Sequence, residues 1–391
     1  MAYRENLPKK TPLTPPKKGT SPTTPTKGTA PTVPTKGTVP TFPTAARPKS
    51  NLLYYLIVLC VLGNFFPYII TTSVNCYNAR GFVRRAAFDH LISVRDIKKK
   101  ELEAFFAKRR GDAQQIRTNP LYKWAIASYV EAYKKGGVDG SDYVDVDNRY
   151  GRSFKGVADS YGYYDIYVLD MAGNVVYSAR RHPELGKNVL APPYADTPLA
   201  EAYRRGKAAV TLGDIKWYEP YNGPARFDSA PVMEEGQDEP FAVIVFHMDG
   251  SVINEMMSER PGLKETGETY LVAQDLLMRS DSRFTPWSDV LKAKVDTVAS
   301  REALAGNTDC RIIRDYRNVP VLSAYAPLEI ASGLRWAVIA EIDKAEAMAI
   351  EDKLFNQVVY MTFAMLPIWG GIVFVFYRLI NKDSEAYYGS K

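Results

Sequence analysis

Two long apolar stretches near opposite ends of the chain constrain its fold more than any other feature. Residues 51–74 and 355–380 contain no Asp, Glu or Lys, and their only Arg is Arg378, near the end of the second stretch. A bilayer core about 30 Å thick needs about 20 apolar residues in a helix, and a helix satisfies its own backbone polar groups in lipid. We therefore predict two transmembrane helices, with the intervening sequence folded outside the bilayer.

The charge distribution predicts the orientation of these two spans. Residues 1–50 carry nine basic residues and one acid, Glu5, which accounts for the net charge of +6 of the whole chain. Basic flanks stay in the cytoplasm, so both termini are expected there. Arg80, Arg84 and Arg85 follow the first span and oppose this rule, but they begin a large domain, where the rule is weaker. Because the excess charge belongs to one terminal segment, no nucleic-acid partner is predicted.

The N-terminal segment is a Pro/Thr/Lys-rich arm with a nine-residue repeat, read as PKKGTSPTT (16–24), PTKGTAPTV (25–33) and PTKGTVPTF (34–42). Frequent prolines block helices and sheets, and the segment has little apolar surface to bury. We predict a disordered, partly polyproline-II arm. It is either a spacer or a docking arm for a cytoplasmic partner.

Residues that could carry catalysis or bind a metal are scarce. The three histidines, His90, His182 and His247, lie in different segments, which leaves no zinc site, and no phosphate-binding loop or nucleophile constellation is present. We predict a non-enzyme without metal or cofactor. The sequence does not decide whether Cys76 and Cys310 form a disulfide.

The region between the spans alternates between helical and strand patterns. Apolar residues recur at helical spacing from about Asn78 to Ile116, and Asn119-Pro120 ends this helix. A second helix reaches about Lys135, and a third covers about Asp249 to Arg260. Short β-rich runs between turns predict strands at 164–170, 174–178, 208–218, 227–233, 241–248, 268–274, 276–279, 310–314, 319–327 and 334–342. Hairpin-connected strands with separate helices indicate an α+β fold with two antiparallel sheets on one stalk helix.

Several segments resemble the periplasmic double Cache sensor domain of bacterial chemoreceptors, sensor kinases and membrane nucleotide cyclases. They are YYDIYVLDMAGNVVYS (163–178), LGKNVLAPPYADTPLAEAY (185–203), GDIKWYEPYNGPARFDSAPV (213–232), ETGETYLVAQDLLMRSDSRF (265–284) and VPVLSAYAPLEIASGLRWAVIAEIDKAEAM (319–348). The resemblance covers roughly residues 78–348 and implies two stacked PAS-like modules. The expected organisation is an arm (1–50), a first span (51–74), a stalk helix (75–118), a membrane-distal module (119–260), a membrane-proximal module (261–350), a second span (355–380) and a tail (381–391).

The resemblance also implies a place and a mode of action. It suggests a bacterial inner-membrane protein with a periplasmic domain. Family members usually continue into a cytoplasmic output domain, whereas residues 381–391 are too few for one. We therefore expect a separate cytoplasmic or membrane partner for output. The stalk helix from Asn78 to Ile116 is expected to form a homodimer, because its apolar stripe is longer than one small domain needs to cover.

Domains of this family bind small polar molecules on one face of the distal sheet. The matching segments offer nine candidate ligand-binding residues: Tyr163, Asp165, Tyr167, Asp214, Lys216, Tyr218, Tyr221, Phe227 and His247. Strand alternation would place Asp214, Lys216 and Tyr218 on one face. The alternative is that the aromatic residues belong to the core and the charged ones to a solvated edge.

The ligand class follows from one departure from the family pattern. Amino-acid-binding members usually carry an Asp on the last distal strand, where this chain has His247. Imidazole holds an ammonium group poorly, so a carboxylate or another small polar solute is expected before an α-amino acid. His247 is alternatively a core histidine.

The proximal module has its own polar set: Tyr270, Arg279, Ser280, Asp281, Ser282, Arg283 and Tyr325. We interpret it as an internal Arg–Asp network that is structural or transmits a signal. Two function classes stay open: a ligand-sensing receptor subunit, and a ligand-free structural or assembly subunit of a membrane complex.

Overall fold

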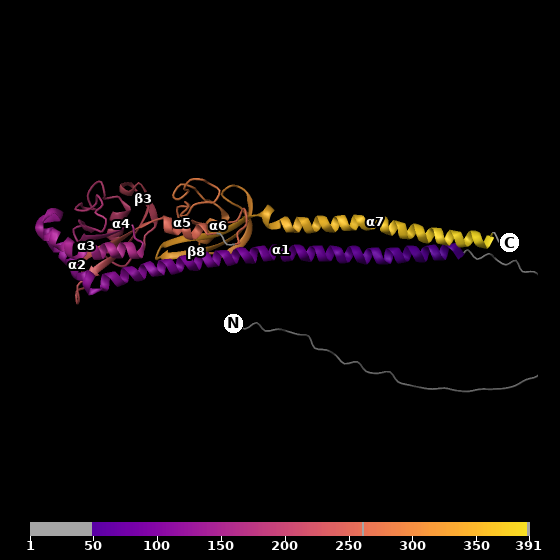
Figure 1. Ribbon diagram of the computed structural model, residues 1–391, viewed down its shortest axis with the longest axis horizontal. Helices are drawn as coiled ribbons and strands as arrows, with labels where there is room; N and C mark the ends of the chain where they lie inside the picture. Colours follow the sequence, from indigo (N-terminus) through magenta and orange to yellow (C-terminus); the bar gives the residue numbers. More distant parts are fainter. Residues whose placement is uncertain (1–48, 260–261, 389–391) are drawn as a thin grey trace, which may run out of the picture. The chain divides into compact units, whose positions relative to one another are not determined.

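The computed structural model describes residues 49–259 and 262–388 (Figure 1). The predicted N-terminal arm lies almost wholly outside the described residues, so its predicted disorder stays a prediction. The described residues begin with α1 (Lys49–Thr118), a helix of 70 residues. It ends where Pro120, which lacks an N–H group, starts the next helix, α2 (Pro120–Gly136). Asn119 caps α2, because its side-chain oxygen accepts a hydrogen bond from the N–H of Leu121 at 2.9 Å.

Two further helical elements complete the first helical layer. A 3-10 turn, η1 (Gly137–Asp139), leads into α3 (Ser141–Tyr161). Sequence patterns did not predict α3. It ends at Gly162, whose φ of 73° is left-handed and suits glycine. Its few buried residues include Phe154, which packs against Tyr129 of α2 and Tyr177.

The first sheet has five antiparallel strands in the order β2-β1-β5-β4-β3. The strands are β1 (Asp165–Asp170), β2 (Val175–Ser178), β3 (Ile215–Tyr218), β4 (Gly223–Met233) and β5 (Pro240–Asp249). Helices α1 to α3 pack on one face of this sheet, and α4 (Pro198–Gly206) packs on the other. A second 3-10 turn, η2 (Glu219–Tyr221), joins β3 to β4. We call residues 119–259 the distal module.

The second sheet has four antiparallel strands in the order β6-β9-β8-β7. They are β6 (Glu268–Val272), β7 (Asp309–Arg314), β8 (Pro320–Ala331) and β9 (Leu334–Asp343). Helix α5 (Ser251–Ser258) precedes this sheet, α6 (Val298–Leu304) packs on it, and α7 (Lys344–Tyr388) follows it. We call residues 262–343 the proximal module. The predicted strand 276–279 is absent, since this segment forms only isolated bridges at Leu277 and Met278.

The predicted strand 208–218 is shorter than expected. Only Ile215–Tyr218 forms β3, while Thr211 makes an isolated bridge to Ser229. The backbone before β3 passes very close to β4 at Gly213, where a Cβ would lie 2.3 Å from the carbonyl oxygen of Phe227. The antiparallel sheets, the separate helices and the long helix nevertheless agree with the predicted α+β class.

The apolar stripe of α1 is covered within one chain over much of its length, which corrects the expectation that it needs a second copy. Leu91 and Val94 are buried against the proximal module, in a cluster that includes Leu322 and Ala340. Leu102 and Phe106 are buried in a cluster that contains residues of both modules. The dimer itself stays a prediction, and the buried part of the stripe is not available to it.

Among the described residues, one helical stretch is long and apolar enough to cross a membrane, namely Phe355–Leu379 in α7. At 1.5 Å per residue, 25 residues exceed the 30 Å of a typical bilayer core. The first predicted span, 51–74, lies within α1, and its crossing of the membrane stays a prediction. Cys76 and Cys310 are both free thiols in this structure.

Candidate functional site

The candidate site lies on the face of the distal sheet that α4 covers. Three neighbouring strands place Asp165, His247 and Phe227 in one row, because β5 pairs Asp165 with His247 on one side and Phe227 with His247 on the other. Side chains at directly paired positions project to the same face of a sheet. The row unites residues from three separate parts of the sequence.

Five aromatic rings surround the imidazole of His247. The ring of Phe227 stacks on it at 4.5 Å between centroids, and those of Tyr164 and Tyr221 lie at 4.7 and 5.2 Å. Tyr218 and Tyr167 follow at 5.9 and 6.4 Å. Tyr167, Tyr218, Phe227 and His247 are buried, whereas Tyr164 and Tyr221 are partly exposed. The rings form a cage whose rim consists of Tyr164 and Tyr221, which contact each other at 4.6 Å.

His247 is buried without the hydrogen bonds that a buried imidazole usually has. Only 1% of its surface is exposed, and neither Nδ1 nor Nε2 has a hydrogen-bond partner among the described residues. Burial lowers the pKa of His247 to about 3, with a smaller contribution from His182. The ring is therefore neutral at physiological pH, with one donor and one acceptor nitrogen.

Glu184, which sequence reasoning missed, supplies the carboxylate of the site. Tyr218 Oη donates a hydrogen bond to its Oε1 at 2.5 Å, and this bond adds to burial in raising the pKa of Tyr218. The side chain of Glu184 is buried, and its Oε2 has no partner among the described residues. Glu184 lies in the loop between β2 and α4, where no periodic pattern distinguishes one acid from another.

Asp165 is a structural member of this row. Its carboxylate accepts hydrogen bonds from Ser178 Oγ at 2.6 Å, from the N–H of Ile166 at 2.7 Å and from the N–H of Arg180 at 3.2 Å. Burial raises its pKa, although these hydrogen bonds oppose that effect. Asp165 thus fixes the turn after β2, from which the loop with Glu184 departs.

Three predicted site residues lie elsewhere. Tyr163 belongs to the opposite face of the sheet, where its ring packs on Phe246 and beneath the guanidinium of Arg109. Lys216 is exposed, and its Nζ pairs with Glu201 at 2.5 Å. Asp214 precedes β3 and accepts two hydrogen bonds from Arg279 of the proximal module. The strand-alternation argument was wrong for this trio, because the strand begins only at Ile215.

The proximal polar set makes many hydrogen bonds, but the expected Arg–Asp pairs within the set do not form, because its arginines and Asp281 bond to residues outside it. Arg279 joins Asp214 and Asp275, while Asp281 binds Asn254 and Ser288. Ser282 donates to Glu268 at 3.1 Å. Glu268 and Glu341 are direct partners on β6 and β9, and Tyr270 Oη donates to Glu341 at 2.8 Å.

Comparisons with known proteins give matches among solved structures alone: no protein-family model and no curated protein sequence matches the chain. The ligand-binding domain of the Pseudomonas fluorescens chemoreceptor CtaA, in complex with L-isoleucine, is 11% identical, with a TM-score of 0.46 over 70% of this chain and 99% of that one. The ligand-binding domain of Campylobacter jejuni Tlp3, in complex with 4-methylisoleucine, is 9% identical, with a TM-score of 0.49 over 68% and 94%. That of Pseudomonas aeruginosa PAO1 PctB, in complex with L-Arg, is 14% identical, with a TM-score of 0.44 over 67% and 97%. All three of these solved structures are ligand-binding domains of bacterial chemoreceptors.

Proposed function

We propose that this protein is a membrane-anchored sensor that binds a small polar solute in the ring cage around His247 and acts through a separate partner. One observation carries the proposal. Two nitrogens of His247 and one oxygen of Glu184 are buried without partners among the described residues. Leaving a buried polar atom unsatisfied costs about 1–3 kcal/mol. A solute that supplies the missing hydrogen bonds would recover this free energy.

The charges around the cage indicate the chemical class of the solute. Glu184 and Asp165 are the buried acids on this side, and Asp249 lies beside the rim residue Tyr221. The cations close to the cage are engaged elsewhere: Lys216 with Glu201, and Arg180 with Asp159 at 2.8 Å. A carboxylate ligand would meet acids here, so the earlier expectation of a carboxylate loses its support. We propose a solute with an ammonium, amide or hydroxyl donor for Glu184, and aromatic faces attract an ammonium group as well.

The rim residues supply the route by which a solute enters. The inner rings are fully packed in this structure, so a ligand needs space that ring movement creates. Tyr164 and Tyr221 are the partly exposed members, and Tyr221 lies on the short turn η2. We propose that these two rings swing apart when the solute enters. The packed inner rings favour the second candidate function, a ligand-free scaffold in which His247 is a core residue.

Membrane anchoring and assembly complete the proposal. Phe355–Leu379 is apolar enough to span a bilayer, and the basic arm argues for a cytoplasmic N-terminus. We propose a two-pass protein with the two modules outside the cytoplasm. We propose a homodimer through the exposed face of α1 that carries Phe82, Ala86, Ser93 and Ile97.

A thermal-shift screen of the full chain in detergent tests the proposal against amines, amino acids, amides, polyols and organic acids. A ligand at 100 times its Kd should add about 2.7 kcal/mol to the free energy of unfolding. His247→Phe and Glu184→Gln should fold and lose this response, whereas Glu131→Gln, an exposed change on α2, should keep it. A hit that stabilises all variants equally would place the site elsewhere. A screen without hits, together with higher stability of His247→Phe, would favour the scaffold.

A further inference from the structure

Two acidic side chains are buried next to each other in the proximal sheet. Glu268 is the first residue of β6 and pairs directly with Glu341 on β9. Directly paired positions project to the same face of a sheet, with their Cβ atoms about 4.5–5.5 Å apart. Glu268 is 2% exposed and Glu341 1%. The pair belongs to the proximal module and is therefore separate from the cage around His247.

The side-chain hydrogen bonds to these two carboxyl groups come from hydroxyls. Tyr316 Oη and Ser282 Oγ donate to Glu268 at 2.9 and 3.1 Å, and Tyr270 Oη donates to Glu341 at 2.8 Å. The other oxygen of Glu341, Oε1, has no hydrogen-bond partner in the part of the chain that the structure describes. Hydroxyls bring hydrogens to the cluster but no positive charge.

A count of hydrogens shows that the cluster has one too few when both acids are ionised. Ser282 Oγ and Tyr316 Oη lie 2.6 Å apart, and each also contacts a different oxygen of Glu268. Three oxygen–oxygen contacts of this length need three hydrogens, whereas the two hydroxyls supply one each. A proton held by the pair of acids would supply the third.

The arginines beside the pair are engaged by other groups. Arg317 is shared by Asp315 and Asp343, at 2.6 and 2.7 Å. Arg283 directs its guanidinium to two backbone carbonyls. Two ionised carboxylates in this position would therefore face each other in a buried place without a cation of their own, which is a costly arrangement.

The pKa values of both acids are raised accordingly. Burial raises the pKa of Glu341 to about 8, and the negative charges of Glu268 and Asp315 add to this effect. Burial raises the pKa of Glu268 as well, although the neighbouring hydroxyls and Arg317 oppose it. On β8, Ser323 is the direct partner of Glu341 and brings a hydroxyl but no charge. Because the two acids interact, the proton belongs to the pair rather than to one residue.

The pair lies at the end of the sheet from which α7 leaves. Glu341 is two residues before Asp343, the last residue of β9, and α7 begins at Lys344. Thr266, just before β6, accepts a hydrogen bond from the N–H of Asp343 and donates one to Glu346 in the first turn of α7. The start of β6 and the start of α7 are therefore joined directly beside the pair.

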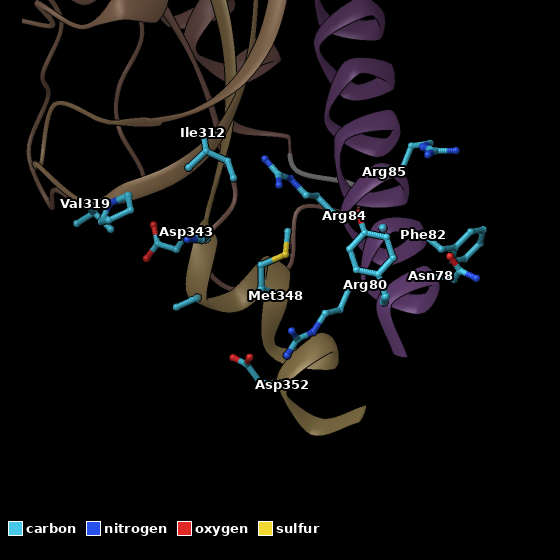
Figure 2. Close-up of a pocket in the computed structure, with 15 residues that line it drawn as sticks. Asn78, Arg80, Phe82, Arg84, Arg85, Ile312, Val319, Asp343, Met348 and Asp352 are labelled. Carbon is cyan, nitrogen blue, oxygen red and sulfur yellow. The ribbon is translucent and has the colours of Figure 1, made fainter. Parts of the chain in front are cut away.

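A cavity beside this junction gives the first turns of α7 room to shift (Figure 2). Its volume is about 1220 Å³, and its lining includes Asp343, Lys344 and Met348. Figure 2 shows Asp343, Met348 and Asp352 along the passage from β9 into α7, with Arg84 of α1 on the opposite side. A small displacement of α7 at this point would meet open space on the side of α1.

We propose that Glu268 and Glu341 form a proton-binding site that makes the proximal module a pH sensor. With one proton bound, the pair carries a single negative charge and the hydrogen bonds around Glu268 are complete. When pH rises, a carboxylic O–H bond breaks and the proton passes to hydroxide or water beyond the partly exposed Tyr316. Two negative charges then face each other at the first rung of the β6–β9 ladder.

The repulsion separates the ends of β6 and β9, and the hydrogen bonds of Thr266 pass this displacement to the start of α7. The candidate membrane span begins further along the same helix, at Phe355. The inference is independent of the solute site in the distal module.

Infrared difference spectroscopy of the full chain in detergent tests the proton site. The carbonyl stretch of a buried, protonated carboxyl group should disappear as pH rises from 6 to 10, with a midpoint near pH 8. Glu341→Gln should lack this change, whereas Glu329→Gln, which removes an exposed acid from β8 of the same sheet, should keep it. Glu268→Gln removes the opposing charge, so the midpoint should fall by about 1 pH unit.

Three spectroscopic results would overturn the proton site. They are a wild-type spectrum without such a change, a change that Glu341→Gln retains, and an unaltered midpoint in Glu268→Gln. The last result would identify Glu341 as a single buried acid rather than a member of a pair.

Hydrogen exchange read by mass spectrometry tests the connection to α7. After correction for the intrinsic effect of pH, peptides from β6 and the first turns of α7 should exchange about tenfold faster at pH 9 than at pH 6, because one pKa unit is a factor of 10 in an equilibrium constant. Peptides from β4 and β5 of the distal module are the internal control and should not change.

The same variants decide the outcome of the exchange experiment. Glu341→Gln should exchange slowly at both pH values, and Glu329→Gln should behave as wild type. If Glu341→Gln does not fold, Glu268→Gln replaces it, and its onset of fast exchange should move to lower pH with the infrared midpoint. A pair that titrates while exchange at the start of α7 stays constant would overturn the proposed sensor.

Discussion

Arg279 and Asp214 form a two-pronged ion pair that joins the proximal module to the distal module. Arg279 Nε and Nη2 donate to the two carboxylate oxygens of Asp214 at 3.0 and 2.8 Å. Trp336 Nε1 donates to the same carboxylate at 2.9 Å. The arginine side chain is only 2% exposed and that of Asp214 16%. Since Asp214 directly precedes β3, which ends at Tyr218 of the cage, the pair connects the candidate site to the proximal sheet.

Removing one partner of this pair should destabilise the protein strongly. Asp214→Asn leaves the buried guanidinium of Arg279 with Asp275 as its remaining ion-pair partner. Breaking a buried pair in this way costs about 3 kcal/mol or more. The free energy of unfolding from urea titration should fall by this amount. Glu131→Gln, which breaks an exposed pair with Lys134, should cost less than about 1 kcal/mol. Equal losses in the two variants would show that the buried pair of Asp214 and Arg279 contributes no more to the free energy of unfolding than the exposed pair of Glu131 and Lys134.

His247 should make the protein less stable in acid. Because its pKa is lowered to about 3 in the folded state from 6.5, the unfolded chain binds a proton between these values that the folded chain does not. The free energy of unfolding should therefore rise with pH in this window, by up to about 1.4 kcal/mol per pH unit from this group, and show no further change from it above pH 6.5. His247→Phe should lack this contribution. The measurement is urea unfolding of both proteins at pH 4, 5, 6 and 7, and parallel curves would contradict the prediction.

Glu341 should produce the opposite dependence at higher pH. Burial raises its pKa to about 8, against the effects of the Ser323 and Tyr270 hydroxyls, and Glu268 faces it from β6. Between about pH 4.5 and pH 8 the folded chain holds a proton that the unfolded chain has lost, so the free energy of unfolding falls as pH rises. Glu341→Gln imitates the protonated form and should be more stable than wild type at pH 8 and equal to it near pH 4. Glu131→Gln is the control, because its side chain is 64% exposed.

The sequence predicted most of the elements because they follow strong local patterns. The runs that became β1, β5, β8 and β9 are rich in β-branched and aromatic residues, and their predicted limits differ from the observed ones by a few residues. Helix α3 was not predicted because its buried surface is small. Its buried residues are Tyr143, Phe154, Val157 and Ala158, among many polar ones. Its position depends on packing against α2 and β2, which no local pattern reveals.

The candidate site was predictable only in part, for a similar reason. Asp165, Tyr167, Tyr218, Tyr221, Phe227 and His247 do come together. Their meeting depends on the pairing of β1 with β5, about 80 residues apart in the chain. The carboxylate of Asp214 lies outside the cage because it accepts hydrogen bonds from Arg279 and Trp336, which are distant in sequence. Strand alternation treats a segment as if it were isolated, so it cannot foresee a carboxylate that turns toward another module.

Dimerisation should use the face of α1 that the proximal module leaves uncovered. Leu91 and Val94 are buried within the chain, whereas Phe82 is 74% and Ile97 54% exposed. Ala86 and Ser93 lie on the same exposed face at helical spacing. Their small side chains would let two helices approach closely. Ala86→Cys and Ser93→Cys should therefore form disulfides between two chains in membranes under mild oxidation.

The buried stripe supplies the control for this last experiment. Leu91→Cys lies under the proximal module and should not crosslink unless the protein unfolds. Crosslinking at both exposed positions, with none at Leu91, would place two copies of α1 side by side along this face. A ligand-induced shift of about 1–2 Å in one module could then pass to a partner through these helices. If neither exposed position crosslinks while the protein stays folded, α1 does not pair with its copy through this face, and a different protein is left to cover Phe82 and Ile97.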